Sequence, residues 1–267
     1  MPHRLAVVGP GSMAAAVVKG LVGSGWTRAT MVTGYHPRRE RAQEIAKAAG
    51  FKVVTRLPEA VQGAETVLLG VKPQILPETL MELRGLVEKQ QLVLSMAAGF
   101  STRRIEDVLP GVPVVRCMPN LACTVGLGAT AICPGEHATK EHVARAREVF
   151  QAVGTVEEVP EKLMDAVTGL SGTGPMYVFH LVEAMADAGV KVGLSRDVAS
   201  RLALQTVIGS ARLAQASHLH PAALKDLVTS PGGTAIAALH VLRREGFQAI
   251  VMDAVEAAAK RSAELGQ

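Results

Sequence analysis

Gly9, Gly11 and Ala14 stand at the spacing G-x-G-x-x-A, directly after the apolar run at residues 4–8. A strand-like run, a glycine turn and a helical pattern over residues 13–24 form the context in which this spacing binds a dinucleotide. The first glycine permits the turn, the second lets backbone approach a pyrophosphate, and the small third residue lets helix and strand pack closely. We predict a cofactor site at Gly9, Gly11, Ser12, Met13 and Ala14; the alternative is a plain strand-to-helix turn.

His36, Arg38 and Arg39 follow the second strand-like run, at residues 30–33, and no carboxylate occurs before Glu40. An NAD site usually places Asp or Glu here to bond the ribose 2′-hydroxyl. Arginine instead grips a 2′-phosphate through two parallel hydrogen bonds. The three residues therefore favour NADPH as cofactor, with NAD as the weaker alternative. Both arginines would also fit as solvated side chains at a helix start.

Two further loops follow the strand-like runs at residues 66–69 and 92–95. Open α/β sheets bind ligands at this carboxyl edge, and small residues there leave room for a nicotinamide ring. We therefore predict cofactor contacts from both loops, although Lys72 fits equally well as a surface residue before a turn-forming proline. The residues are Val71, Lys72 and Pro73 in the first loop and Ala97, Ala98 and Gly99 in the second.

The elements that must position these loops change character along the chain. Strand-like runs at 4–8, 30–33, 66–69, 92–95 and 112–117 alternate with helical patterns, which predicts α/β architecture with a Rossmann-type, doubly wound parallel sheet. Ala- and Leu-rich stretches at 176–188, 195–216, 221–228, 234–245 and 248–265 then predict helices. We expect a Rossmann domain for NADP over residues 1–160 and an all-α C-terminal domain over residues 161–267.

Composition excludes several classes of function. The chain has 267 residues, 48% of them hydrophobic and 3% aromatic, with a formal net charge of +4. Few aromatic residues and no basic stripe argue against a nucleic-acid partner. Three cysteines without a CxxC pair predict neither a disulfide framework nor a metal site. The N-terminal apolar run is too short for a signal sequence, and no stretch is long enough to span a membrane. We expect a cytoplasmic protein.

The helical half contains one further candidate site, in the turn formed by Ser230, Gly232, Gly233 and Thr234. Two glycines followed by threonine at a helix start indicate backbone N–H groups arranged to bind an anion. The same residues also fit a capped loop. A second turn of small residues, at 170–175, opens an earlier helix, and Pro175 suits its first turn.

Together these motifs resemble the pyrroline-5-carboxylate reductase family. The resemblance runs nearly end to end and includes the glycine turn, residues 71–73, 97–99, 116–120, 170–175, 220–226, 230–234 and 246–258. It implies NADPH-dependent reduction of 1-pyrroline-5-carboxylate to L-proline, the last step of proline biosynthesis. It also implies that the helical domain binds substrate and joins two subunits in a homodimer, with a decamer of five dimers as a larger form.

Under this resemblance the substrate is a small anionic ring held beside the nicotinamide. Backbone N–H groups of Gly232, Gly233 and Thr234 would bind its carboxylate, aided by the helix dipole, and Asn120 would contribute to substrate binding. The imine nitrogen also needs a proton, from a hydroxyl or a water molecule.

The chain departs from the family at the position of the expected proton donor. The family places Thr where this chain has Ala235, so Thr234, Ser230 or water must take its place. Leu121 and Ala122 replace a usual Thr-Pro pair, and His218 replaces a common carboxylate.

Three other functions are alternatives to pyrroline-5-carboxylate reduction. A hydroxyacid dehydrogenase of similar layout needs a lysine shortly after the second small-residue turn, but none occurs between Gly174 and Lys191. A paralogue acting on another cyclic imine acid, and an NADPH-binding protein without catalysis, are the open alternatives.

Overall fold

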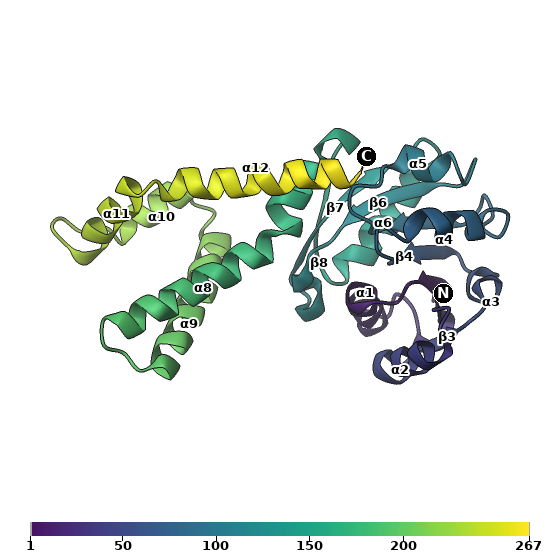
Figure 1. Cartoon of the computed structure of the whole chain (residues 1–267), viewed down its shortest axis with the longest axis horizontal. Coiled ribbons are helices and arrows are strands. Elements are labelled where there is room, and N and C mark those ends of the chain that lie inside the picture. The colour runs from purple at the N-terminus through teal and green to yellow at the C-terminus, as the bar shows by residue number, and fades with distance from the viewer. Residues whose placement is uncertain (1, 267) are drawn as a thin grey trace. The chain divides into compact units, whose positions relative to one another are not determined.

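The computed structural model describes residues 2–266, which pack as two compact units (Figure 1). The first holds residues up to Thr173 and the end of the chain from Glu256, and the second holds residues 174–255. This division by packing differs from the expected boundary after residue 160, because residues 161–173 and the end of the last helix pack with the first unit. No helix within residues 2–266 has both the length and the hydropathy that crossing a membrane requires.

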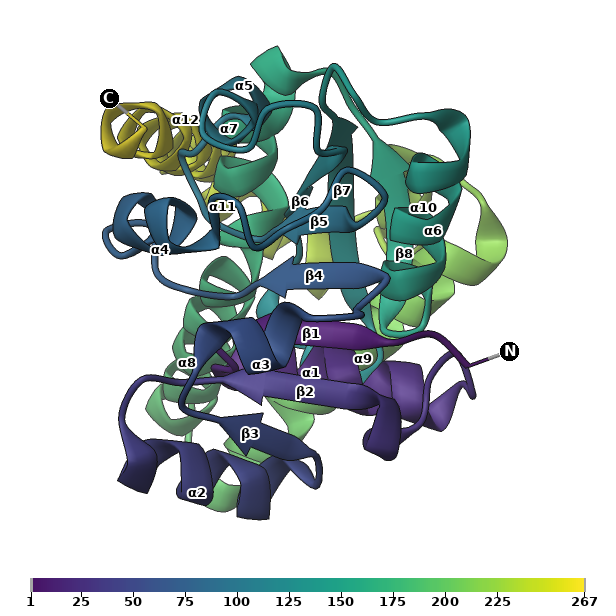
Figure 2. The same ribbon diagram turned by 90° about the vertical axis from the view of Figure 1, so that its right-hand side faces the viewer.

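An eight-stranded sheet forms the centre of the first unit, in the order β3-β2-β1-β4-β5-β6-β7-β8 (Figure 2). Neighbouring strands are parallel except β6 and β7. The connection between these two, residues 119–127, is shorter than the dozen or so residues that a parallel crossover needs. The strands are β1 Leu5–Val8, β2 Val32–Tyr35, β3 Lys52–Val54, β4 Thr66–Leu69, β5 Leu92–Ser95, β6 Val114–Met118, β7 Gly128–Pro134 and β8 Gly154–Glu158.

Helices cover both faces of this sheet, which confirms the predicted doubly wound α/β class. One apolar cluster joins Leu5 and Val7 to α1 and α6, and another joins Ala6 and Val8 to α3, α4 and α5. Successive residues of a strand point to opposite faces of the sheet. All four residues of β1 are buried, which is why the strand is apolar throughout rather than alternating. The helices of this unit are α1 Ser12–Gly23, α2 Arg39–Ala49, α3 Leu57–Val61, α4 Leu76–Leu83, α5 Thr102–Glu106, α6 Lys140–Gln151 and α7 Met164–Val167.

The strand predictions were incomplete in the first unit. The second strand occupies 32–35 rather than 30–33, because Ala29–Met31 forms a 3-10 turn before it. Strands β3, β7 and β8 have no predicted counterpart. Strand β8 is mostly exposed and ends in two glutamates, and β3 has only three residues. Neither shows the long apolar run typical of a buried parallel strand.

The second unit is helical, as predicted, and lacks an apolar centre of its own. Ala186, Ala199 and Ala203 are its buried apolar residues, whereas Phe179 is 62% exposed and Ile250 61% exposed. Such large exposed apolar residues are typical of surfaces that contact another protein. The helices are α8 Gly174–Lys191, α9 Arg196–Ser217, α10 Pro221–Leu227, α11 Thr234–Arg244 and the first part of α12 Phe247–Leu265.

Candidate functional site

Three loops at the carboxyl edge of the sheet are tied to the ends of neighbouring strands. The Gly9 N–H donates to the Tyr35 carbonyl at 3.2 Å, and the His36 N–H donates to the Val54 carbonyl at 3.1 Å. The Gly70 N–H donates to the Val8 carbonyl at 2.8 Å. These bonds hold the loops that follow β1, β2 and β4 side by side, as expected where an open α/β sheet binds its ligand.

The turn after β1 has the shape that a dinucleotide requires. Gly9 has φ +79°, and a Cβ there would lie 2.8 Å from the backbone nitrogen of Val71, so only glycine fits. A Cβ on Gly11 would meet no atom within 4 Å, which leaves the backbone open to a ligand at the N-terminus of α1. The unpaired N–H groups and positive dipole end of such a helix suit phosphate.

A pocket of about 570 Å³ opens beside this turn. Its walls come from the three loops, from α2 and from α4. The lining residues are Gly9, Pro10, Gly11, Tyr35, His36, Pro37, Arg38, Arg41, Ile45, Gly70, Val71, Lys72, Ile75, Glu78, Thr79 and Glu82. A glycine turn at a helix start, cationic side chains and apolar side chains together fit the phosphates and the base of NADP.

The cationic residues of this pocket are Arg38, Arg41 and Lys72, and Arg39 is not among its lining residues. Arg38 precedes α2 as its N-cap, so Arg41 lies three residues further on the same helical face, whereas Arg39 is the next residue along and belongs to another face. The Arg38 N–H donates to His36 Nδ1 at 3.2 Å. Burial lowers the pKa of His36, and the charges of Arg38 and Arg41 lower it further, although the hydrogen bond with the Arg38 backbone acts in the opposite direction.

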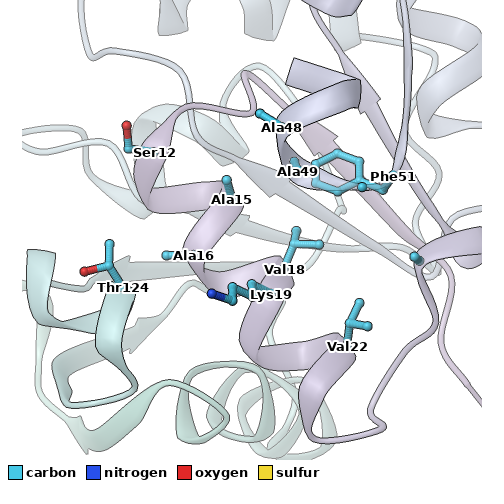
Figure 3. Close-up of a pocket in the computed structure, with 12 residues that line it drawn as sticks. Ser12, Ala15, Ala16, Val18, Lys19, Val22, Ala48, Ala49, Phe51 and Thr124 are labelled. Carbon is cyan, nitrogen blue, oxygen red and sulfur yellow. The ribbon is translucent and has the colours of Figure 1, made fainter. Parts of the chain in front are cut away.

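The remaining predicted residues of the glycine turn lie outside the pocket. Ala14 is buried in the core between α1 and the sheet, and Met13 packs against the same cluster. Ser12 lines a separate hollow of about 410 Å³ on the outer side of α1, together with the end of α2 (Figure 3). Lys19 is the charged residue of that hollow, and its other lining residues are mostly small and apolar.

The loop after β5 is used mainly for packing within the first unit. Ala97 is buried, and Ala98 packs against the cluster around Met118 and Met164. A Cβ on Gly99 would lie 2.8 Å from the backbone nitrogen of Gly266, at the end of the chain. The pocket lining does not include Pro73, Ala97, Ala98 or Gly99. Contact of these four residues with the cofactor stays a prediction.

The side chain of Asn120 holds two turns together. Its Oδ1 accepts the N–H groups of Ala122 at 3.2 Å and Ala129 at 3.3 Å, and its Nδ2 donates to the Ser171 carbonyl at 3.1 Å. Ser171 belongs to a π-turn over Thr168–Gly172, a form often found near functional sites. Asn120 therefore positions the 170–175 motif, and one amide hydrogen is left for the predicted substrate contact.

The turn before α11 offers fewer free N–H groups than its sequence indicates. The Gly233 N–H donates to the Ser230 carbonyl at 3.1 Å, so it is already occupied. No hydrogen bond within residues 2–266 engages the N–H groups of Gly232 and Thr234, and no side chain caps the helix. Of the three predicted donors, Gly232 and Thr234 keep an unengaged N–H group, and the helix dipole also favours an anion at this end.

A buried charge network, not predicted from the sequence, lies within the first unit. The Arg116 side chain is 4% exposed and pairs with Glu161, with 2.5 Å between Nη1 and Oε1. Burial alone would raise the pKa of Glu161, but hydrogen bonds from Thr102 and Arg116 outweigh it and lower that pKa. Burial and the Glu161 charge raise the pKa of the neighbouring Cys133 thiol to about 12.

This network reaches the chain end through Asp165. Its Oδ1 accepts the Ser262 hydroxyl at 2.7 Å and lies 3.8 Å from Arg116 Nη2. The cluster thus joins β6, α7 and the end of α12, and has a structural role rather than a place in the pocket.

Sequence reasoning missed several pocket residues that helical spacing would have found. Arg41 and Ile45 lie on the same face of α2 as Arg38, which was predicted. Four more residues follow one face of α4: Ile75, Glu78, Thr79 and Glu82. Both sets repeat at three and four residues, the spacing of a single helical face. Nothing in the linear sequence places these two faces opposite each other.

Known protein families match both halves of the chain. Residues 4–99 match the family model of coenzyme F420-dependent NADP oxidoreductases, and residues 161–265 match that of the pyrroline-5-carboxylate reductase dimerisation domain. A pyrroline-5-carboxylate reductase of Synechocystis is 43% identical over the full length of both chains. The chain belongs to the pyrroline-5-carboxylate reductase family.

Solved structures of pyrroline-5-carboxylate reductases share this fold. The enzyme from Coxiella burnetii has a TM-score of 0.92 and 31% identity, with all of both chains covered. The Plasmodium falciparum enzyme, solved with NADP bound, has a TM-score of 0.89 and 29% identity, covering 99% of this chain and 98% of that one. Family membership sets aside the hydroxyacid dehydrogenase alternative. It also confirms a nicotinamide-dependent oxidoreductase whose helical domain is a dimerisation domain.

Proposed function

We propose that this protein reduces 1-pyrroline-5-carboxylate to L-proline with NADPH, as the last step of proline biosynthesis. The observation that carries the proposal is the open glycine turn beside Arg38 and Arg41, in a chain whose relatives over its full length are pyrroline-5-carboxylate reductases. When bound, NADPH supplies the hydride that the C=N carbon of the substrate accepts.

The preference for NADPH over NADH is assigned to Arg38 and Arg41. Both line the pocket, and the sequence after β2 has no carboxylate before Glu40, whereas an NAD site usually places one at the end of this strand. Arg41 is also paired with the exposed Glu44, at 2.6 Å, and this surface pair is weak enough to yield to a phosphate. Arg39 was predicted from the sequence to share this role, but it does not line the pocket, and we do not assign it to the 2′-phosphate.

The substrate carboxylate is assigned to the turn before α11. The unengaged N–H groups of Gly232 and Thr234 and the dipole of an eleven-residue helix support an anion there. A proton for the imine nitrogen comes from the hydroxyl of Thr234 or Ser230, or from water, because Ala235 has none. Asn120 acts by holding the π-turn in place, with its remaining amide hydrogen toward substrate.

The active form is a homodimer joined through the helical domain, and we extend this to a decamer of five dimers. The exposed apolar side chains of the second unit support association, since burying them against another subunit removes apolar area from water. A cytoplasmic location, expected from the cysteine content, stays a prediction.

Ala235 favours a second candidate function, in which the same fold acts on another cyclic imine acid or binds NADPH without turnover. A panel of imines separates these cases: 1-pyrroline-5-carboxylate, its 2-carboxylate isomer and the six-membered ring, each with NADPH and with NADH. The proposal expects oxidation of NADPH that depends on 1-pyrroline-5-carboxylate, with proline formed in equal amount. Thermal stabilisation by NADPH with no turnover on any imine would instead identify a binding protein.

A further inference from the structure

The α4 wall of the cofactor pocket carries a carboxylate that has no partner within the protein. Ile75, Glu78, Thr79 and Glu82 line the pocket from this helix. The Thr79 hydroxyl donates to the Ile75 carbonyl at 3.0 Å, and the Glu82 carboxylate accepts a hydrogen bond from the Tyr35 hydroxyl. Within residues 2–266, Glu78 makes neither a side-chain hydrogen bond nor an ion pair, so its oxygens are available to a ligand.

Apolar side chains flank the same part of the pocket. Ile75 at the start of α4 is 50% exposed, and Ile45 lines the pocket from α2. An aromatic base needs this combination, with apolar groups against its faces and hydrogen-bonding groups at its edge.

The order of groups along the pocket fixes which part of the cofactor reaches α4. The pyrophosphate belongs at Gly9 and Gly11, at the start of α1, and the ribose 2′-phosphate belongs at Arg38 and Arg41. An adenine base attached to that ribose would reach the part of the pocket that α2 and α4 line. Its exocyclic amino group is a donor, and an ionised carboxylate is an acceptor only.

We propose that Glu78 selects the base of the cofactor, by accepting a hydrogen bond from the exocyclic amino group of adenine. A base with a carbonyl at that position, such as hypoxanthine, would set two acceptors against each other. This inference rests on the cofactor site of the proposed function and names a specificity-determining residue within it.

Glu78 also stands in the first turn of α4, where a carboxylate stabilises the positive end of the helix dipole. Stabilising the helix dipole and selecting the cofactor base can be told apart by experiment. Loss of a dipole interaction changes stability and leaves the ratio of affinities for two bases unchanged. Loss of the adenine contact changes that ratio.

The test is equilibrium binding to the full-length protein, followed by the fluorescence of the reduced nicotinamide. NADPH is compared with reduced nicotinamide hypoxanthine dinucleotide phosphate, which differs only in the base. We expect the wild-type protein to bind NADPH about tenfold more tightly, the factor for one hydrogen bond to a charged group. Glu78→Gln should bring the two affinities within about twofold, because an amide both donates and accepts.

Two further variants complete the design. Glu78→Lys should reverse the preference, since an ammonium donates to the hypoxanthine carbonyl. Glu141→Gln removes the first-turn carboxylate of α6, outside the pocket, and should keep the wild-type ratio. Equal affinities in the wild-type protein, or an unchanged ratio in both Glu78 variants, would overturn the assignment. Because the readout needs no turnover, absence of imine reduction would refute the reductase and leave this result standing.

Discussion

The hydroxyl of Ser230 occupies the space that a side chain on Gly233 would fill. A Cβ at Gly233 would lie 2.3 Å from Ser230 Oγ, and the Gly233 N–H donates to the Ser230 carbonyl at 3.1 Å. These two contacts close the turn before α11. They also hold the backbone around the unengaged N–H groups of Gly232 and Thr234, to which the proposed function assigns the substrate carboxylate.

Substituting Gly233→Ala should therefore impair substrate binding and leave cofactor binding intact. The new methyl group displaces the Ser230 hydroxyl and disturbs the turn, so we expect KM for 1-pyrroline-5-carboxylate to rise about tenfold, the cost of one charge-assisted hydrogen bond. KM for NADPH should stay within twofold. Steady-state kinetics with each substrate varied in turn measures both constants.

The double variant Ser230→Ala with Gly233→Ala separates the steric clash at Gly233 from any direct role of the Ser230 hydroxyl in binding or catalysis. Removing Ser230 Oγ leaves no atom of Ser230 closer than 3.3 Å to the new Cβ. The double variant should then match Ser230→Ala alone in KM. If it stays as impaired as Gly233→Ala, the clash is not the cause.

Ala235→Thr should raise turnover, because it restores a hydroxyl at the position where the family carries one. The expected gain in kcat is about 100-fold, the lower end of the range for general acid catalysis. Ala238→Thr, an exposed position one turn further along α11, serves as the control for the lower helix propensity of threonine. An unchanged kcat in Ala235→Thr would mean that Thr234, Ser230 or water already supplies the proton.

Arg38→Ala and Arg41→Ala should each raise KM for NADPH about tenfold and change KM for NADH by less than twofold. The reason is that each removes a charge-assisted hydrogen bond to the 2′-phosphate, which NADH lacks. Arg39→Ala is the matched control, since Arg39 precedes Arg41 by two residues and lies outside the pocket lining. An equal effect of Arg38→Ala on both cofactors would refute the phosphate role.

Arg116→Met should destabilise the first unit by about 3 kcal/mol, because it leaves the Glu161 carboxylate without its cation. Arg56→Met, which breaks an exposed 3.2 Å pair with Glu59, should cost at most about 1 kcal/mol. Urea unfolding at pH 7 measures both. Similar losses in the two variants would contradict the importance of the buried pair.

The same pair predicts a dependence of stability on pH. The pKa of Glu161 is lowered in the folded protein, so its contribution is present above its ordinary value of 4.5. The contribution is lost as pH falls through the folded pKa, because the unfolded chain then binds more protons. Wild-type protein should lose stability in this acidic window more steeply than Arg116→Met. Parallel curves for the two proteins would exclude Glu161 as the titrating group.

The local predictions that succeeded depend on short stretches of sequence. The G-x-G-x-x-A turn, strands β4 and β5 at their predicted positions and the five C-terminal helices follow from apolar periodicity and glycine placement. Strand β8 was missed, because a half-exposed edge strand shows little hydrophobic signal.

The sequence by itself determined the fold class, the family and the existence of a dinucleotide turn, because these depend on neighbours within a few residues or on motifs matched in order. Only the tertiary structure decided that Arg41 rather than Arg39 lines the pocket with Arg38, that the Asn120 side chain holds two turns together, and that Glu78 lines the same pocket as α2. Each depends on where distant segments meet. Residues 38–45 and 75–82 form one pocket because β1 lies between β2 and β4 in the sheet, a neighbour relation that linear spacing does not contain.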